Sequence, residues 1–163
     1  MHAPSEDKSD DSKENFYEEV EQVSFNHFPK YHMKIILGDF NARVGRKNIF
    51  KPKIGNESIL RDSNDNGVRI ENFTTSKNLV VKITMFTHRN IYKYTWTSPE
   101  GKTHNQTDHI LIERRWNSHI VDVWSSTVAD CDTDHCLVVA GVRERLAVRK
   151  QAARKFEVER FNP

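Results

Sequence analysis

Six short runs of residues, apolar or alternating in polarity, constrain the fold of this 163-residue chain more than any other feature. Each run has the length of a β-strand, and polar segments separate the runs. The runs are residues 33–37, 79–81, 92–96, 108–112, 120–123 and 136–140. Two longer segments, residues 12–28 and 66–77, have apolar residues at helical spacing instead. A mainly stranded middle with two flanking helices predicts an α/β sandwich.

The pattern also predicts which side chains face the core and which strands pair. In the second predicted helix, Val68 and Phe73, with Ile70 as a third, are expected to face inward. Residues 92–112 are predicted to form one β-hairpin with a long tip, because a Ser-Pro-Glu-Gly turn separates two strand-like runs.

Length and composition predict a single globular domain without a membrane segment. Hydrophobic residues make up 36% of the chain and charged residues 29%, which suits a soluble protein. No stretch approaches the roughly 20 apolar residues of a membrane span. Only two cysteines are present, Cys131 and Cys136, so a disulfide framework is not expected and a reducing compartment fits. Their spacing to the histidines matches no usual zinc pattern.

Charge is distributed unevenly along the chain, although the net charge is only +2. Residues 1–22 contain eight acids and two lysines, whereas residues 143–163 contain seven bases and three acids. We therefore expect a domain over residues 1–142 and a basic linker or tail over residues 143–163. A mildly basic body is compatible with nucleic-acid binding but does not require it.

Polar side chains with catalytic potential stand at the ends of three predicted strands. Asp39 and Asn41 follow the first strand, behind a glycine that allows a tight turn. Asp108 begins a later strand, and Asp134 with His135 stands immediately before the last one. Strand ends beside loops are where α/β enzymes usually place their chemistry. Each cluster alone is more often a turn or a chance pair than a catalytic group, so only their shared order favours a site.

The order of these clusters resembles the endonuclease/exonuclease/phosphatase superfamily, and most closely the endonuclease domains of non-LTR retrotransposons. The resemblance extends through nearly the whole chain. The segments that carry it are residues 2–8, 36–45, 64–67, 94–99, 105–112 and 132–135. It implies the C-terminal part of a four-layer α/β/β/α sandwich of the DNase I-like kind, and metal-dependent hydrolysis of phosphodiester bonds in DNA.

The resemblance also implies a role for each matching residue. Asp39 orients or deprotonates the attacking water, and Asn41 holds that water and a phosphate oxygen. Asp108 fixes the tautomer and angle of His135, which contacts the scissile phosphate and stabilises its developing charge. Asp134 helps to hold a divalent metal, Mg²⁺ or Mn²⁺, or a water bound to that metal.

Six further residues are expected to contact phosphate or DNA. They are His2, Ser5, Arg43, Trp96, Lys102 and Asn105. His2 stands where more distant relatives have a phosphate-binding tyrosine, and Ser5 where they have another small polar contact. Lys102 and Asn105 lie in the tip of the predicted hairpin, which leans on DNA in relatives but is as readily a solvated turn. Trp96 is either a core residue, the commoner case, or a surface on which a base stacks.

The same resemblance leads us to expect a domain that is incomplete at its N-terminus. The first strands of the family carry an asparagine and a metal-binding glutamate, and neither has a counterpart in this sequence. The acids Glu6, Asp7, Asp10 and Asp11 are interpreted as a solvated run and not as replacements. Missing strands are also expected to leave strand edges and apolar surface exposed.

Three functions are compatible with the sequence. The first is an endonuclease, weakly active or inactive, that acts on DNA in the nucleus or cytoplasm and has a reverse transcriptase domain downstream. The second is a non-catalytic fragment that binds nucleic acid or protein. The third is a small-molecule phosphatase of the same superfamily, although the match around residues 105–109 argues against it.

Overall fold

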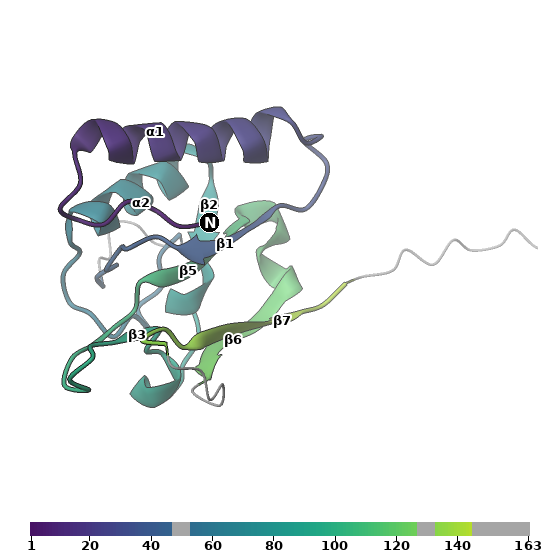
Figure 1. Cartoon of the computed structure of the whole chain (residues 1–163). Coiled ribbons are helices and arrows are strands. Elements are labelled where there is room, and N and C mark those ends of the chain that lie inside the picture. Colours follow the sequence, from purple (N-terminus) through teal and green to yellow (C-terminus); the bar gives the residue numbers. More distant parts are fainter. Residues whose placement is uncertain (47–52, 127–132, 145–163) are drawn as a thin grey trace, which may run out of the picture.

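Two α-helices lie side by side on one face of the protein in the computed structural model, which describes residues 1–46, 53–126 and 133–144 (Figure 1). Helix α1 spans Asp10–Glu21 and continues as a π-helical turn over Gln22–Asn26. Helix α2 spans Asp65–Ser76. Its N-cap is Asn64, whose side chain accepts a hydrogen bond from the backbone N–H of Gly67 at 2.8 Å. Both predicted helices are therefore present.

The helices cover a three-stranded antiparallel sheet with the order β1-β5-β2. Its strands are β1 (Ile35–Asp39), β5 (Asp108–Glu113) and β2 (Leu79–Val81). The register pairs Ile35 with Ile112 and Asp39 with Asp108. The start of the chain lies along the far edge of β1, where the N–H of Ala3 donates to the carbonyl of Asp39 at 2.8 Å.

A second layer of strands lies on the opposite face of this sheet (Figure 1). It consists of the pair β3 (Trp96–Thr97) and β4 (His104–Asn105) and the pair β6 (Ile120–Ser126) and β7 (Leu137–Val142). Backbone hydrogen bonds of 2.8 Å join the pairs, from the N–H of Thr97 to Asp134 and from that of Cys136 to Thr95. Three short 3₁₀ turns occupy Lys82–Thr84, Asn90–Tyr92 and Arg114–His119.

An apolar core fills the space between the helices and the two strand layers. The largest fully buried apolar side chains are Phe40, Ile54, Ile70, Leu79, Ile83, Leu111, Ile112 and Ile120. Helix α1 packs on this core through Phe16, whose ring meets that of Phe40 edge to face with centroids 6.1 Å apart. The predicted α/β class is confirmed, and the helix, sheet and sheet layers match three of the four expected layers.

Three local predictions were wrong. The strand predicted over residues 92–96 begins only at Trp96, because Asn90–Tyr92 forms a 3₁₀ turn and residues 93–95 are not in a strand. Val68 was expected to face the core, but it is 39% exposed, whereas Ile70 and Phe73 are buried. Residues 92–112 do not form one hairpin, because β3 pairs with the short β4 and β5 pairs with β1 and β2 in the other sheet. β5 is the central strand of its sheet, with β1 and β2 on its two edges, and its residues His109–Ile112 are buried.

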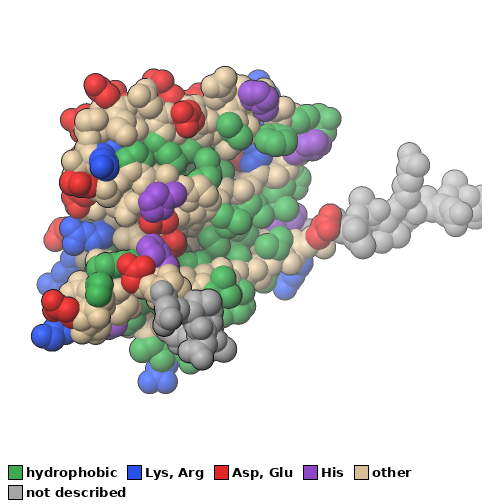
Figure 2. Space-filling model, in the orientation of Figure 1, with side chains coloured by type: hydrophobic (Ala, Val, Ile, Leu, Met, Phe, Trp, Pro, Cys, Tyr) green, Lys and Arg blue, Asp and Glu red, His purple; other side chains and the backbone are tan. Residues whose placement is uncertain are grey.

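Apolar side chains are exposed between the open edges of β1 and β7. Leu37 is 53% exposed and Leu137 is 58% exposed, and hydrophobic surface gathers over this region (Figure 2). Among the described residues, β1 pairs only with β5 and the first residues of the chain, and β7 pairs only with β6. This agrees with the expected exposure of strand edges and apolar surface.

Most of the predicted basic tail lies outside the described residues, which end at position 144, so the proposed boundary after residue 142 stays a prediction. A search of the described helices finds none with the length and apolar character that a membrane span requires.

His109, the second residue of β5, is a buried histidine with a relative exposure of 1%. Its Nε2 lies 2.7 Å from the carbonyl oxygen of Ala42, so Nε2 carries the proton and donates it. Nδ1 has no hydrogen-bond partner among the described residues. Burial lowers the pKa of His109 despite the opposing effect of that hydrogen bond. The ring is therefore neutral in the folded protein.

We expect this buried ring to make the protein less stable in mild acid. Because the folded pKa lies below the unfolded one, the unfolded chain binds more protons as the pH falls below about 6.5. The free energy of unfolding should then decrease by up to about 1.4 kcal/mol per pH unit through this group. Urea denaturation across this range, compared with His109→Gln, measures the effect. An identical pH dependence in the variant would contradict the assignment.

Candidate active site

Two carboxylates that are far apart in the sequence meet at the end of the first sheet. Asp39 closes β1 and stands opposite Asp108, the first residue of β5, in the antiparallel register. Directly opposed residues of antiparallel strands point their side chains to the same face. The chain turns after Asp39, and Asn41 takes a positive φ of 48° while its N–H donates to Oδ1 of Asp39 at 2.8 Å. This hydrogen bond fixes the Asp39 side chain relative to the backbone of Asn41.

His135 lies between the two carboxylates. Its Nδ1 is 3.1 Å from Oδ2 of Asp108, and its Nε2 is 3.9 Å from Oδ2 of Asp39. A carboxylate beside Nδ1 accepts a hydrogen bond from the Nδ1–H group and so fixes the orientation of the ring. The predicted relation between Asp108 and His135 therefore has a suitable geometry. The backbone bridge between Trp96 and His135 carries the histidine to this position.

His2 also reaches Asp39, although it stands at the start of the chain. Its Nδ1 is 3.2 Å from Oδ2 of Asp39, and its own side chain is 75% exposed. Asp39 itself is only 9% exposed, and its Oδ2 makes no hydrogen bond within the described part of the chain. The imidazole nitrogens of His2 and His135 are near this oxygen without a hydrogen bond to it, so the oxygen can still accept one from a water or substrate.

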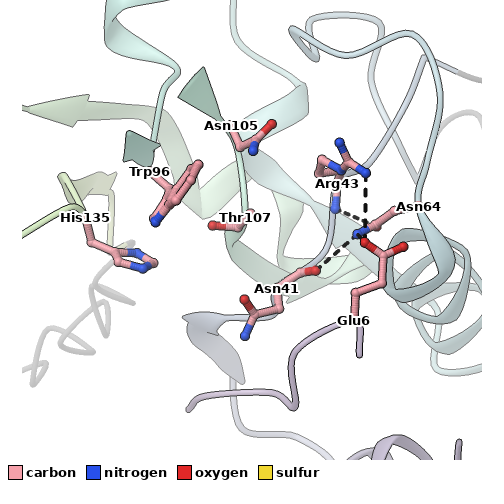
Figure 3. A pocket seen from close by; sticks show the side chains of 8 residues that line it. All are labelled: Glu6, Asn41, Arg43, Asn64, Trp96, Asn105, Thr107 and His135. Carbon is pink, nitrogen blue, oxygen red and sulfur yellow. Dashed lines mark hydrogen bonds and ion pairs between the residues drawn. The ribbon is translucent and has the colours of Figure 1, made fainter. Parts of the chain in front are cut away.

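An open cavity of about 230 Å³ lies beside these residues (Figure 3). The residues that line it are Glu6, Asn41, Arg43, Asn64, Trp96, Asn105, Thr107 and His135. Five of them were predicted as site residues, and their side chains come from both strand layers and from the loops between them. The cavity is large enough for a phosphate group with part of its flanking chain.

Glu6 is exposed, as expected of a solvated run, and it also lines this cavity. Its Oε2 accepts a hydrogen bond from Nδ2 of Asn64 at 3.2 Å and lies 3.9 Å from Nη2 of Arg43. Its Oε1 accepts one from the N–H of Asp65, in the first turn of α2, at 3.4 Å. A carboxylate is stabilised at a helix N-terminus, and the asparagine cap of α2 is the only sequence signal that points to this arrangement.

The second strand layer contributes Trp96 and Asn105. Trp96 is half-buried, and its Nε1 donates to Oδ2 of Asp134 at 2.7 Å. Trp96 is thus partly a packing residue and partly a wall of the cavity. Tyr94 and His104 stack with ring centroids 4.5 Å apart, which stiffens the same β3–β4 pair.

Three predicted contact residues lie outside the cavity lining, namely His2, Lys102 and Ser5, and His2 contacts Asp39 instead. Lys102 is exposed at the tip of the β3–β4 turn. The hydroxyl of Ser5 donates to the carboxylate of Asp7 and does not line the cavity. The structure gives no support to a contact of Lys102 or Ser5 with a phosphate beside His135.

The residues of this site do not fit a metal ion held by protein side chains alone. Within the described ranges, no group of three or more His, Cys, Asp or Glu side chains is placed to hold one. The predicted metal ligand, Asp134, is exposed and already hydrogen-bonded to Trp96. Mg²⁺ usually binds through one or two carboxylates together with waters and substrate phosphates, so it does not require such a group of side chains.

Two curated proteins resemble this chain in sequence, whereas no family model matches it. Craniofacial development protein 2 of Bos taurus is 32% identical over 158 residues, which are 97% of this chain and 26% of that protein. The protein of the same name from Tragulus javanicus is 34% identical over 141 residues, which are 86% of this chain and 24% of that protein. The chain therefore spans about a quarter of the length of these relatives.

Two solved structures resemble the fold. The endonuclease domain of TRAS1, a telomere-specific non-LTR retrotransposon, aligns with a TM-score of 0.54 and 15% identity, over 82% of this chain and 52% of that one. The AP endonuclease LMAP from Leishmania major aligns with a TM-score of 0.50 and 16% identity, over 83% of this chain and 43% of that one. At such low identity the likeness concerns the fold alone. It shows that this chain has a DNase I-like fold, and its sequence is similar to that of craniofacial development protein 2.

Proposed function

We propose that this chain hydrolyses phosphodiester bonds in DNA as a weakly active endonuclease of the retrotransposon type. The observation that carries the proposal is the placement of His135, with Nδ1 3.1 Å from Asp108 and Nε2 3.9 Å from Asp39. Hydrolysis of a phosphodiester needs an oriented water and a donor to the charge that develops on phosphate oxygens. Asp39 and His135 supply these two functions from opposite sides of one small space.

The chemistry follows from the donors and acceptors at the site. Oδ2 of Asp39 accepts a proton from the attacking water while the water oxygen forms its bond to phosphorus. The bond to the leaving oxygen breaks, and that oxygen keeps the electron pair and takes a proton from solvent. Protonated His135 donates from Nε2 to a phosphate oxygen, and the carboxylate of Asp108 stabilises its positive charge. Asn41 keeps Asp39 oriented through its N–H and offers its side-chain amide to the same space.

The walls of the cavity suit a nucleic-acid backbone. Arg43 is exposed beside Asn41 and is a cation within reach of a phosphate, although it also faces Glu6. Trp96 and Asn105 form the wall on the second layer and present an aromatic face and an amide. A DNA substrate, a reverse transcriptase domain downstream and a nuclear location belong to this proposal.

A non-catalytic nucleic-acid-binding role is the second candidate. The missing cluster of metal ligands among the described residues favours it, because the loss of metal coordination lowers rate more than it lowers backbone binding. In that case the cavity residues contact phosphate without promoting water attack.

Nicking of supercoiled plasmid in Mg²⁺ or Mn²⁺ separates the two candidates. We expect slow nicking by the wild type and a loss of at least about 100-fold in Asp39→Ala and His135→Ala, because each removes a group that transfers or donates a proton. Glu19→Ala is the matched control, since Glu19 is an exposed acid on α1. Nicking by Asp39→Ala at the wild-type rate would place the activity elsewhere.

Wild-type protein that binds DNA without nicking it would favour the second candidate. Release of phosphate from inositol phosphates in place of DNA cleavage would support the small-molecule phosphatase that the sequence also allowed.

Metal binding in the absence of DNA provides a separate prediction. Because the described residues hold no group of three ligands, titration of the protein with Mn²⁺ alone should show no saturable site below about 1 mM. Isothermal titration calorimetry measures this directly, and addition of a short DNA duplex should increase the apparent affinity. A micromolar site in the free protein would contradict the geometry.

A further inference from the structure

The start of helix α2 holds the loop that carries Asn41. The sequence there is Asn64-Asp65-Asn66-Gly67. Two side-chain amides from this segment donate to the same acceptor, the backbone carbonyl of Asn41. Nδ2 of Asn64 lies 3.3 Å from that oxygen and Nδ2 of Asn66 lies 3.2 Å from it. Both lone-pair directions of this carbonyl are therefore occupied.

The double contact restrains a backbone conformation that the chain does not adopt by default. Asn41 has a φ of 48°, in the left-handed region that is uncommon for residues other than glycine. Its side chain continues the constraint, because Nδ2 donates to the carbonyl of Ala3 at 2.8 Å. The Oδ1 atom of Asn41 is then left to face the cavity. Rotation of the peptide after Asn41 would move this amide and the N–H that orients Asp39.

Of Asn64 and Asn66, Asn66 gives the clearer evidence for a role in positioning the loop. It is 2% exposed and does not line the cavity, so it has no route to a substrate. The same Nδ2 also donates to the carbonyl of Pro4 at 3.0 Å. Asn66 therefore ties together the two segments on either side of Asp39, the chain start that carries His2 and the loop that carries Asn41.

Gly67 permits this close approach of the helix. A Cβ atom at position 67 would lie 2.0 Å from the carbonyl oxygen of Arg43, so no other residue fits without displacing the loop. Asn64 completes the contact, since its Oδ1 accepts the N–H of Arg43 and the N–H of Gly67, both at 2.8 Å. The same residues therefore cap helix α2 and hold the loop of the site in place.

From this geometry we infer that Asn66 is a positioning residue of the site, which acts through Asn41 and touches neither substrate nor reacting atoms. The expected fall in the nicking rate rests on the proposed phosphodiester hydrolysis. The expected displacement of the Asn41 loop does not depend on that function. Small displacements of a group that orients a nucleophile lower the rate of the chemical step more than they weaken binding.

The test compares Asn66→Asp and Asn66→Ser with Asn72→Ala. Aspartate keeps the shape of the side chain but replaces the donating amide by an acceptor, and serine offers one shorter donor. Asn72 is the matched control, an exposed asparagine on the same helix. In plasmid nicking we expect the turnover rate of Asn66→Asp to fall about 10- to 100-fold with less than about a 3-fold change in KM. Asn72→Ala should behave as wild type.

Nuclear magnetic resonance of the Asn41 side-chain amide gives a readout that does not depend on activity. We expect its resonance to shift and its hydrogen exchange to accelerate in both Asn66 variants, while resonances of β6 stay in place. Folded Asn66 variants in which the Asn41 amide resonance does not move, or which keep wild-type turnover, would overturn the inference. Failure of both variants to fold would also overturn it, because Asn66 would then be a stability residue. If the wild type does not nick DNA, the proposed function fails and the Asn41 resonance alone decides the positioning role.

Discussion

The antiparallel register of β1 on β5 is the constraint on which the rest of the site depends. Because Ile36 and Leu111 oppose each other in the buried core, the pairing is fixed by apolar packing. A slip of one residue would turn the buried side chains of β1 toward the opposite face. The same register places Asp39 opposite Asp108, so core packing determines the position of both carboxylates. His135 then enters from the second layer and contacts both.

A second constraint comes from polar contacts at the start of α2. Its cap residue and its first turn hold the loop after β1 and the start of the chain, which are the two segments next to Asp39. Such networks stabilise a single arrangement only when nearly all their groups are satisfied. Asp39 is the exception, because its Oδ2 lacks a hydrogen bond within the described residues, and an unsatisfied acceptor in a supported site is where a reactant is expected.

Much of this arrangement could be predicted from the sequence, and the failures have identifiable causes. Strand ends and motif order were enough to group Asp39 with Asp108 and His135, since these positions follow from local pattern. The partner of β5 could not be predicted, because strand pairing depends on burial by residues far away in sequence. The place of Glu6 in the cavity lining could not be predicted for a related reason, since only the position of the α2 N-terminus brings this exposed acid there. The metal prediction rested on resemblance alone.

The proposed function depends on the binding of phosphate at the cavity beside His135. A competing site exists at the opposite end of the first sheet, where Lys30, Lys34, Lys77 and Arg115 line a cavity of about 420 Å³ with Glu113. Titration of isotope-labelled protein with a short phosphorothioate oligonucleotide, followed by nuclear magnetic resonance, distinguishes the two. We predict saturable shifts at Asn41, Asn105 and His135. Shifts confined to Lys34 and Arg115, with His135 unaffected, would contradict the account.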